Sequence, residues 1–351
     1  MTTIQDLEAP APRVDLRQAI AHETDYTRAP DGERIFVQHW RPARGSVDAV
    51  MVLSHGLGEH TAVYLPFVEH FAARGAAIYA HDHRGFGRSE GRRGHVPRYQ
   101  RYVDDLLPLV RRARAENVGL PLVLVGHSMG GTIALLFALR HPRLLDAAIY
   151  SAPALMVTAA IPLWKRTLGR AMSRVYPTYT DTGVSDPTLL TRDPALQQVT
   201  REDTVRHAHV TARLYVEMFG RAPAEVFRRA KELRVPFLLL HGTEDPLVPA
   251  EASQRLYDLA VAAPARDLRL YPGLRHEPFR ELEREEVFGD VAAWLAAQGI
   301  ALTHPSHLTP HPVADWPPDP YPRDCRSSAP LPTAGATLTP RPPLPRSGEG
   351  E

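Results

Sequence analysis

The fold is decided by the stretch LPLVLVGHSMGG, residues 120–131. Its first half is a short apolar run with β-branched residues, which is typical of a buried parallel strand. The residues after Gly130 are mostly apolar and predict a helix that is packed on most sides. A serine in a G-x-S-x-G pattern between strand and helix predicts a nucleophile elbow, which lifts the Ser128 hydroxyl above the sheet. Glycines suit this turn because a Cβ at Gly126 or Gly130 would clash with neighbouring elements.

A second G-x-S-x-G pattern surrounds Ser89, at residues 87–91. No apolar strand precedes it and no helical pattern follows it, so we interpret this copy as a loop. The surrounding sequence therefore favours Ser128 as the candidate nucleophile.

Strands and helices alternate on both sides of the elbow. The apolar runs predict strands at 34–40, 49–54, 76–80, 120–125, 146–151, 235–242 and 267–271. The helical spacing of apolar residues predicts helices at 64–74, 102–117, 131–140, 251–262 and 281–298, with a kink at Pro108 in the second of these. This alternation predicts an α/β fold, a mostly parallel sheet with helices on both faces. Functional residues in such folds lie at the carboxyl ends of the strands.

The alternation is interrupted between residues 153 and 221. This stretch shows helical pieces, one of them over 203–219, and no clear strand. We interpret it as a helical cap insertion over the carboxyl ends of the strands. The predicted organisation is a loose lead-in at 1–22, a core formed by 23–152 and 222–300, the cap at 153–221, and a Pro-rich disordered tail at 301–351. The tail contains 13 of the 34 prolines and cannot bury enough apolar surface to order itself.

Composition narrows the function classes. The net charge of +1 over 351 residues gives no reason to expect a nucleic-acid partner. The single cysteine, Cys325, rules out a disulfide framework or a multi-thiolate metal site within one chain. No secretory leader and no apolar run of membrane length are visible, so we expect a cytoplasmic protein.

A serine nucleophile needs a base and a group that orients the base, and in this fold they follow in the order serine, acid, histidine. The acid should follow a late strand. Asp245 lies directly after the predicted strand 235–242, and its neighbour Glu244 is sterically an equal candidate.

The base should follow the last strand, where His276 lies. Three other histidines compete with it. His241 ends a strand but precedes the acid, while His207 and His209 fall in the cap. Chain order and strand position favour His276.

The oxyanion of an acyl transfer needs preorganised N–H donors. The elbow provides the N–H of Met129, and the glycine-rich loop after the strand 49–54 provides the N–H of Leu57. The same loop holds His55, Glu59 and His60, but their spacing fits neither of the H-E-x-x-H and H-x-x-E-H zinc motifs. We therefore expect no metal and no cofactor.

Three motifs together resemble the monoacylglycerol lipase and lysophospholipase group of α/β-hydrolases. These are HGLGEH at 55–60, DHRGFGRSEG at 82–91 and GHSMGG at 126–131. A cap stretch, DPTLLTRDP at 186–194, resembles the same group, and the similarity covers about residues 25–298. The first two motifs are much more specific than G-x-S-x-G, which many hydrolases share.

The resemblance implies a catalytic triad of Ser128, Asp245 and His276, with Leu57 and Met129 as oxyanion donors. It also implies a mobile apolar cap that admits an acyl chain. Two departures from the group stand out. Some members have alanine at the position of Leu57, so the pocket is expected to be narrower here. Many have histidine at the position of Phe86, which removes any polar contact from that loop.

We therefore expect a serine esterase that cleaves lipid-like esters, with monoacylglycerol as the leading substrate. The expected partners are a small lipid ester and, transiently, a membrane surface touched by the cap around residues 152–168. Three alternatives remain open: a lysophospholipase, an acyltransferase that passes the acyl group to an alcohol, and a non-catalytic ligand-binding protein with the same fold. Dehalogenase and epoxide hydrolase chemistry is disfavoured because the related enzymes have an aspartate in place of Ser128.

Overall fold

The structure is a computed structural model that describes residues 19–157, 163–182 and 186–303. The predicted tail, 301–351, and the predicted lead-in, 1–22, lie almost entirely outside these residues. Core and cap belong to the same compact unit of the chain.

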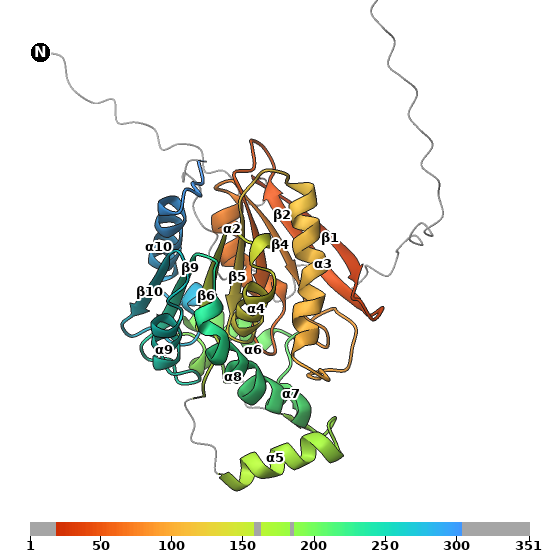
Figure 1. The fold of residues 1–351 in the computed structure, drawn as a ribbon. Coiled ribbons are helices and arrows are strands. Elements are labelled where there is room, and N and C mark those ends of the chain that lie inside the picture. The colour runs from red at the N-terminus through yellow and green to blue at the C-terminus, as the bar shows by residue number, and fades with distance from the viewer. Residues whose placement is uncertain (1–18, 158–162, 183–185, 304–351) are drawn as a thin grey trace, which may run out of the picture. The chain divides into compact units, whose positions relative to one another are not determined.

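One eight-stranded sheet forms the centre of the described structure (Figure 1). Its strands lie in the order β1-β2-β4-β3-β5-β6-β9-β10, and all neighbours are parallel except β1 with β2 and β2 with β4. Their bounds are β1 Ile20–Arg28, β2 Arg34–Pro42, β3 Ala49–Ser54, β4 Ala76–His81, β5 Leu122–His127, β6 Ala147–Ser151, β9 Phe237–Gly242 and β10 Arg266–Tyr271. The predicted mostly parallel α/β-hydrolase sheet is confirmed.

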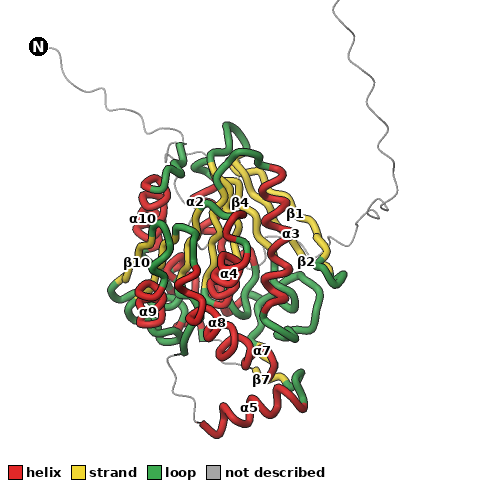
Figure 2. Tube along the Cα trace, in the orientation of Figure 1, coloured by secondary structure: helices red, strands yellow, loops and turns green. Residues whose placement is uncertain are grey.

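Helices cover both faces of the sheet (Figures 1 and 2). Those outside the cap are α2 Leu65–Ala72, α3 Gln100–Glu116, α4 Met129–Arg140, α9 Glu251–Leu259 and α10 Arg284–Ala297. Between β6 and β9 the chain forms α5 Leu163–Val175, α6 Pro194–Glu202, α7 Ala212–Val216, the π-helical turn Glu217–Arg221 and α8 Ala222–Arg229.

Three expectations differ from the structure. The sheet starts at Ile20, earlier than the predicted start of the core at residue 23. The predicted absence of strands in the cap is wrong, because β7 Thr180–Thr182 pairs antiparallel with β8 His209–Thr211. The predicted helix over 203–219 is therefore wrong in its first half. The helix with Pro108 continues as one element from Gln100 to Glu116.

Alternate residues of the central strands supply two cores. Val50 and Val52 of β3 pack with α3 and α4 on one face, while Met51 and Leu53 pack with α2 and α10 on the other. This alternation follows from the period of two in a strand, and burial of both faces explains why β3 is apolar from Ala49 to Leu53. The arrangement brings the carboxyl ends of β3, β5, β9 and β10, with β6 between β5 and β9, to one edge of the sheet, which is where the candidate site lies.

No helix in the part of the chain that the structure describes is long and apolar enough to cross a bilayer.

Replacement of Phe67 should reveal how much the α2 face contributes to stability. Its ring is fully buried and lies 4.5 Å from Phe71 and 5.0 Å from Phe279 between ring centroids. We expect Phe67→Ala to lower the free energy of unfolding by about 3–5 kcal/mol, measured by urea unfolding, because the cavity cannot close around it. Val118→Ala, at a side chain that is 85% exposed, should change it by less than about 0.5 kcal/mol. Equal effects of the two substitutions would contradict this packing.

Candidate functional site

Ser128 occupies a strained turn between β5 and α4. Its φ of 52° and ψ of −117° place a non-glycine residue in a sparsely populated backbone region. The turn is tight because a Cβ on Gly126 would lie 2.5 Å from the Gly130 carbonyl oxygen, and a Cβ on Gly130 would lie 2.1 Å from the Ser54 carbonyl oxygen. Only glycine fits at both positions, so the sequence GHSMG forces this geometry on the serine.

The structure brings Ser128, His276 and Asp245 together in one chain of hydrogen bonds. Ser128 Oγ donates to His276 Nε2 at 2.8 Å, and His276 Nδ1 donates to Asp245 Oδ2 at 2.6 Å. Each residue follows the carboxyl end of a different strand, β5, β10 and β9 respectively. All three are buried, with the serine 7% exposed.

The carboxylate of Asp245 is held from several sides. The backbone N–H groups of Leu247 and Val248 donate to Oδ1 at 2.8 and 2.9 Å, and His241 Nε2 donates to Oδ2 at 3.1 Å. Burial disfavours its charge, but the attraction of His276 and these hydrogen bonds outweigh burial and hold the pKa of Asp245 far below its usual value.

His276 is affected in the opposite sense. Burial lowers the pKa of His276, but the charge and hydrogen bond of Asp245, together with the charges of Glu277 and Glu59, raise it above the usual histidine value. The site therefore stabilises an imidazolium at this position.

The alternative candidates for the acid and the base lie in different surroundings. Glu244 is exposed, whereas Asp245 is buried against His276. His241 lies on the far side of the carboxylate, where Ser253 Oγ donates to its Nδ1 at 2.7 Å. His207 donates to the Gly85 carbonyl oxygen at 2.9 Å.

The serine of the second G-x-S-x-G copy is buried and hydrogen-bonded to backbone groups nearby. Ser89 lies in a loop, is 2% exposed, and accepts a hydrogen bond from the Phe36 N–H at 2.9 Å. Its hydroxyl also donates to the Asp82 carbonyl oxygen at 2.5 Å. Both bonds tie the loop to the sheet.

Leu57 and Met129 lie on the two loops that approach Ser128. Leu57 lines the same cavity as Ser128 and His276. Met129 is the first residue of α4, so its N–H has no partner within the helix and is available to an anion. The backbone can therefore present donors from both sides of the serine.

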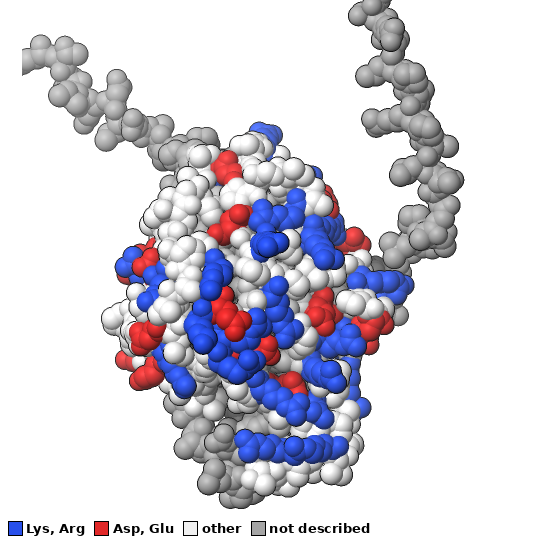
Figure 3. Space-filling model, in the orientation of Figure 1, with Lys and Arg blue, Asp and Glu red and all other residues white. Residues whose placement is uncertain are grey.

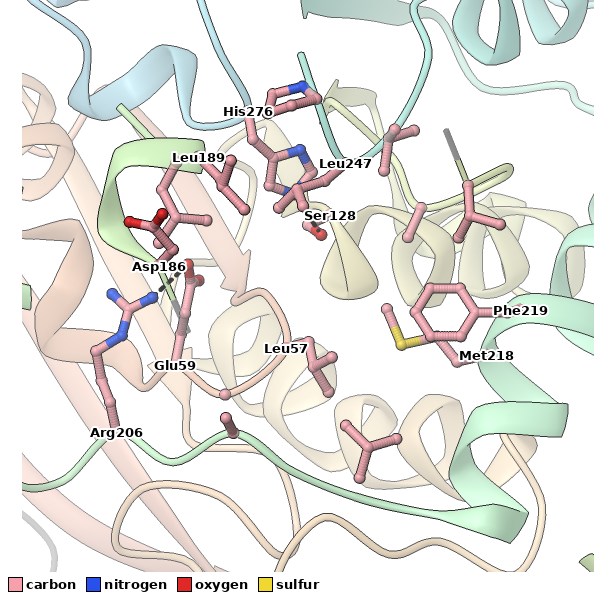
Figure 4. A pocket seen from close by; sticks show the side chains of 18 of the residues that line it. Leu57, Glu59, Ser128, Asp186, Leu189, Arg206, Met218, Phe219, Leu247 and His276 are labelled. Carbon is pink, nitrogen blue, oxygen red and sulfur yellow. Dashed lines mark hydrogen bonds and ion pairs between the residues drawn. The ribbon is translucent and has the colours of Figure 1, made fainter. Parts of the chain in front are cut away.

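A cavity of about 350 Å³ opens at Ser128 (Figure 4). Figure 4 shows Met218 and Phe219 on one side of the serine, Glu59, Arg206 and Asp186 on the other, and Leu247 close to the serine itself. The full lining is Leu57, Gly58, Glu59, Ser128, Ala154, Val157, Asp186, Leu189, Leu190, Arg206, His207, Ala208, Val210, Tyr215, Met218, Phe219, Pro246, Leu247, Val248 and His276. The cavity thus has an apolar end and a polar end, with the serine between them.

Most of this lining comes from the cap. Ala154 and Val157 belong to the stretch 152–168 for which a membrane contact is expected, and both line the cavity. Residues 158–162 of that stretch lie outside the described residues. Phe86, the departure from the family pattern, stacks on His207 of the cap with ring centroids 4.9 Å apart. Its role in the structure is to hold the cap against the core.

Comparison with known proteins agrees with this geometry. A family profile described as serine aminopeptidase, S33, matches residues 45–283, which is more than half of the chain. The monoacylglycerol lipase of Mycolicibacterium smegmatis is 33% identical over 270 residues, 76% of this chain and 94% of that protein. The chain belongs to the monoacylglycerol lipase and lysophospholipase group of the α/β-hydrolases.

Two further relatives support this membership. The human monoglyceride lipase is 29% identical over 76% of this chain and 88% of that protein. The crystal structure of the Paleococcus ferrophilus monoacylglycerol lipase superposes with a TM-score of 0.67 and 26% identity, over 75% of this chain and 99% of the other. As a member of this group, the chain is a carboxylic ester hydrolase.

One set of buried side chains in this hydrolase has the composition of a metal site. Glu59, His127 and Glu277 each offer a ligand atom, and these atoms lie within 4.8 Å of one another. The Arg206 guanidinium already supplies a cation there, with Nη2 3.5 Å from Glu59 and 3.7 Å from Glu277. The three side chains of the loop whose spacing fits no zinc motif each have a hydrogen-bond partner of their own. His55 donates to the Gly56 carbonyl, Glu59 accepts from the Gly56 N–H, and His60 donates to the Asp203 carboxylate.

Sequence reasoning missed the polar end of the cavity. The sequence places Glu59 and Asp186 in the motifs HGLGEH and DPTLLTRDP without indicating a binding role, and it gives no signal for Arg206. Arg206 lies 147 residues from Glu59 in the sequence, so no local pattern relates them. The acidic residue of HGLGEH, Glu59, is the one signal in the sequence that points to this polar end.

The protonation of His276 can be measured directly. In the wild type, NMR titration should give His276 a pKa above 6.5, because the negative charges of Asp245, Glu277 and Glu59 favour the imidazolium. Asp245→Asn removes a charge and a hydrogen bond and should lower that pKa by a unit or more, roughly the size expected for one close charge. His141, whose pKa is lowered by burial, should titrate the same in both proteins. A His276 pKa unchanged by the substitution would contradict the coupling.

Proposed function

We propose that this protein is a serine hydrolase that cleaves monoacylglycerol to glycerol and fatty acid through an acyl-enzyme. The observation that carries the proposal is the hydrogen-bonded chain Asp245–His276–Ser128 at the junction of an apolar and a polar half of one cavity. Membership of the group supports hydrolysis of lipid esters in general.

In the proposed reaction, Ser128 Oγ attacks the ester carbonyl while its proton passes to His276 Nε2. The tetrahedral intermediate collapses as His276 returns this proton to the leaving alcohol, which leaves the acyl group on the serine. Water then attacks the acyl-enzyme, with His276 again as the base, and releases the fatty acid and free Ser128.

The remaining assigned residues stabilise charge. Asp245 orients His276 and stabilises its imidazolium. The lowered pKa of Asp245 and the raised pKa of His276 both agree with this role. The N–H groups of Leu57 and Met129 would bind the oxyanion, each lowering the barrier by about 3 kcal/mol.

The two ends of the cavity suit the two parts of a monoacylglycerol. The acyl chain would lie along Met218, Phe219 and Leu247, where burial of apolar surface favours it. The glycerol would lie toward Glu59, Asp186 and Arg206, whose carboxylates accept from hydroxyl groups and whose guanidinium donates to them.

We also propose that the cap contacts a membrane surface from which the lipid enters. Helix α5 carries no acidic residue and four basic ones, and Figure 3 shows a band of blue across this part of the surface. Large exposed apolar side chains lie on and just beyond it, namely Leu168, Val175, Tyr176 and Tyr179. A basic helix edge with exposed apolar residues suits an interfacial position. A cytoplasmic location belongs to the same proposal and is supported by the single cysteine.

The proposed nucleophile is tested by substitution. Ser128→Ala should lower kcat on p-nitrophenyl esters and on monoacylglycerol by about 10⁴-fold or more, and abolish labelling by a fluorophosphonate probe. Ser89→Ala removes the serine of the other G-x-S-x-G copy; it should lose some stability but keep its labelling. Undiminished activity of Ser128→Ala would overturn the assignment of Ser128 as the nucleophile. An inactive wild type that no probe labels would favour the non-catalytic alternative.

The head group is tested by comparing substrates with one acyl chain. We expect kcat/KM for monoacylglycerol to exceed that for lysophosphatidylcholine by about tenfold or more, because the phosphate would lie near the carboxylates of Glu59 and Asp186, while the Arg206 guanidinium at this end is already paired with Glu59 and Glu277. The reverse preference would support a lysophospholipase. Transfer of the acyl group to an added alcohol in preference to water, seen by product analysis, would support an acyltransferase.

A further inference from the structure

The three loops that carry the proposed catalytic groups also meet in a buried charged cluster. Glu59 lies on the oxyanion loop, His127 precedes the nucleophile, and Glu277 follows the catalytic histidine. They are at most 3% exposed, and one ligand-type atom of each lies within 4.8 Å of the others. Two carboxylates held so close in a buried place repel each other unless a cation neutralises them.

The cap provides this cation. Arg206 Nη2 lies 3.5 Å from Glu59 Oε1 and 3.7 Å from Glu277 Oε1, and its side chain is 9% exposed. Arg280 pairs with the other oxygen of Glu277 at 2.7 Å, so Arg206 is the cation shared by the two carboxylates. Arg206 belongs to the cap segment between α6 and β8, whereas both carboxylates belong to the core.

Each carboxylate is linked to one catalytic loop, Glu59 to the oxyanion loop and Glu277 to the histidine loop. Glu59 Oε2 accepts from the Gly56 N–H at 2.8 Å and from the Tyr64 hydroxyl at 2.6 Å, which fixes the backbone of the oxyanion loop. Glu277 is bonded directly to His276 in the chain, and its own N–H donates to the Leu190 carbonyl of the cap at 2.9 Å. A shift of either carboxylate therefore moves a catalytic loop.

We propose that Arg206 is a positioning residue through which the cap assembles the active site: its guanidinium holds the oxyanion loop and the histidine loop at their working separation. The proposal rests on the proposed function, because it assigns Arg206 a role through Leu57 and His276. It makes the cap part of the catalytic apparatus as well as the wall of the substrate cavity. One guanidinium nitrogen, Nη1, has no protein partner among the described residues, so the fit with the carboxylates does not use all of its donors.

Loss of the guanidinium has two consequences for the site. The carboxylates lose their shared counter-charge, so they move apart or take up a proton. The negative charge near His276 is also no longer balanced, which favours the imidazolium. The charged and titratable groups around His276 come from every neighbouring loop: Asp245 with His241 beyond it, His127, Glu59, Glu277 and Arg206.

The test uses the full chain and a p-nitrophenyl butyrate substrate, whose leaving group has no polyol to bind. Arg206→Gln should lower kcat at least tenfold on this ester and on monoacylglycerol alike, and move the acid limb of kcat/KM to higher pH. Arg201→Gln, at an exposed cation of the same cap, should stay within twofold of the wild type on both substrates. Arg206→Lys keeps the charge and should keep the pH limb of the wild type, with a smaller loss of kcat.

A second substitution separates positioning from packing. Glu59→Gln in the Arg206→Gln background removes the repulsion and should restore kcat at least threefold. A loss confined to monoacylglycerol would overturn the proposal, because Arg206 would then only bind the alcohol. A loss on both esters with an unmoved pH limb and no recovery would also overturn it. Hydrolysis of the p-nitrophenyl ester by the wild type tests the proposed function alone, so the two failures are distinguishable.

Discussion

The structure of the site depends on one close approach, that of the first turn of α4 to the carboxyl end of β3. Position 130 lies so near the Ser54 carbonyl that no side chain fits there. This contact fixes Ser128 at a positive φ and places the N–H of Met129 beside the loop that carries Leu57. Such backbone strain costs about 1–3 kcal/mol. It is offset because α4 is buried along almost its whole length, so the elbow cannot relax without unpacking the centre of the core.

Two neighbouring sets of charged groups determine the electrostatics of the site. Asp245 is ionised at any ordinary pH, since backbone N–H groups and two histidines surround it, and it raises the pKa of His276. Beyond His276, Glu59 and Glu277 add negative charge, and the guanidinium of Arg206 lies between them. The pKa of Glu59 falls to about 2: burial alone would raise it, but the charge of Arg206 together with hydrogen bonds from Glu277 and Tyr64 outweighs burial. The pKa of His276 is therefore set by charges of the core, whereas that of Glu59 depends also on a cation of the cap.

Much of the fold could be predicted because its strands are local patterns. β3, β5 and β9 begin as apolar runs, and Ser128 and Asp245 lie at or just after the ends of β5 and β9. His276 follows β10, Arg266–Tyr271, a strand of mixed character, so its prediction depended on chain order. The cap could not be predicted equally well. His209–Thr211 form a strand because Thr211 binds the Gly94 carbonyl and Val210 lies opposite Asp181, both contacts between distant parts of the chain. Their sequence alone suggested a helix. The polar end of the cavity was missed for the same reason, since Arg206 finds its partners only after the cap has folded over the core.

The π-helical turn Glu217–Arg221 shows how the cap can set selectivity without disturbing the chemistry. An inserted π turn widens a helix and redirects its side chains, and such turns are frequent at functional sites. Here it carries Met218 and Phe219, which line the apolar end of the cavity, while Glu217 turns away to accept from the Tyr99 N–H at 3.1 Å. The Tyr99 hydroxyl in turn donates to the Met129 carbonyl at 2.8 Å. The wall that would contact an acyl chain is thus anchored through Tyr99 to the nucleophile elbow itself. Changes in Met218 or Phe219 alter the room for the chain, whereas a change at Glu217 or Tyr99 would reach the serine.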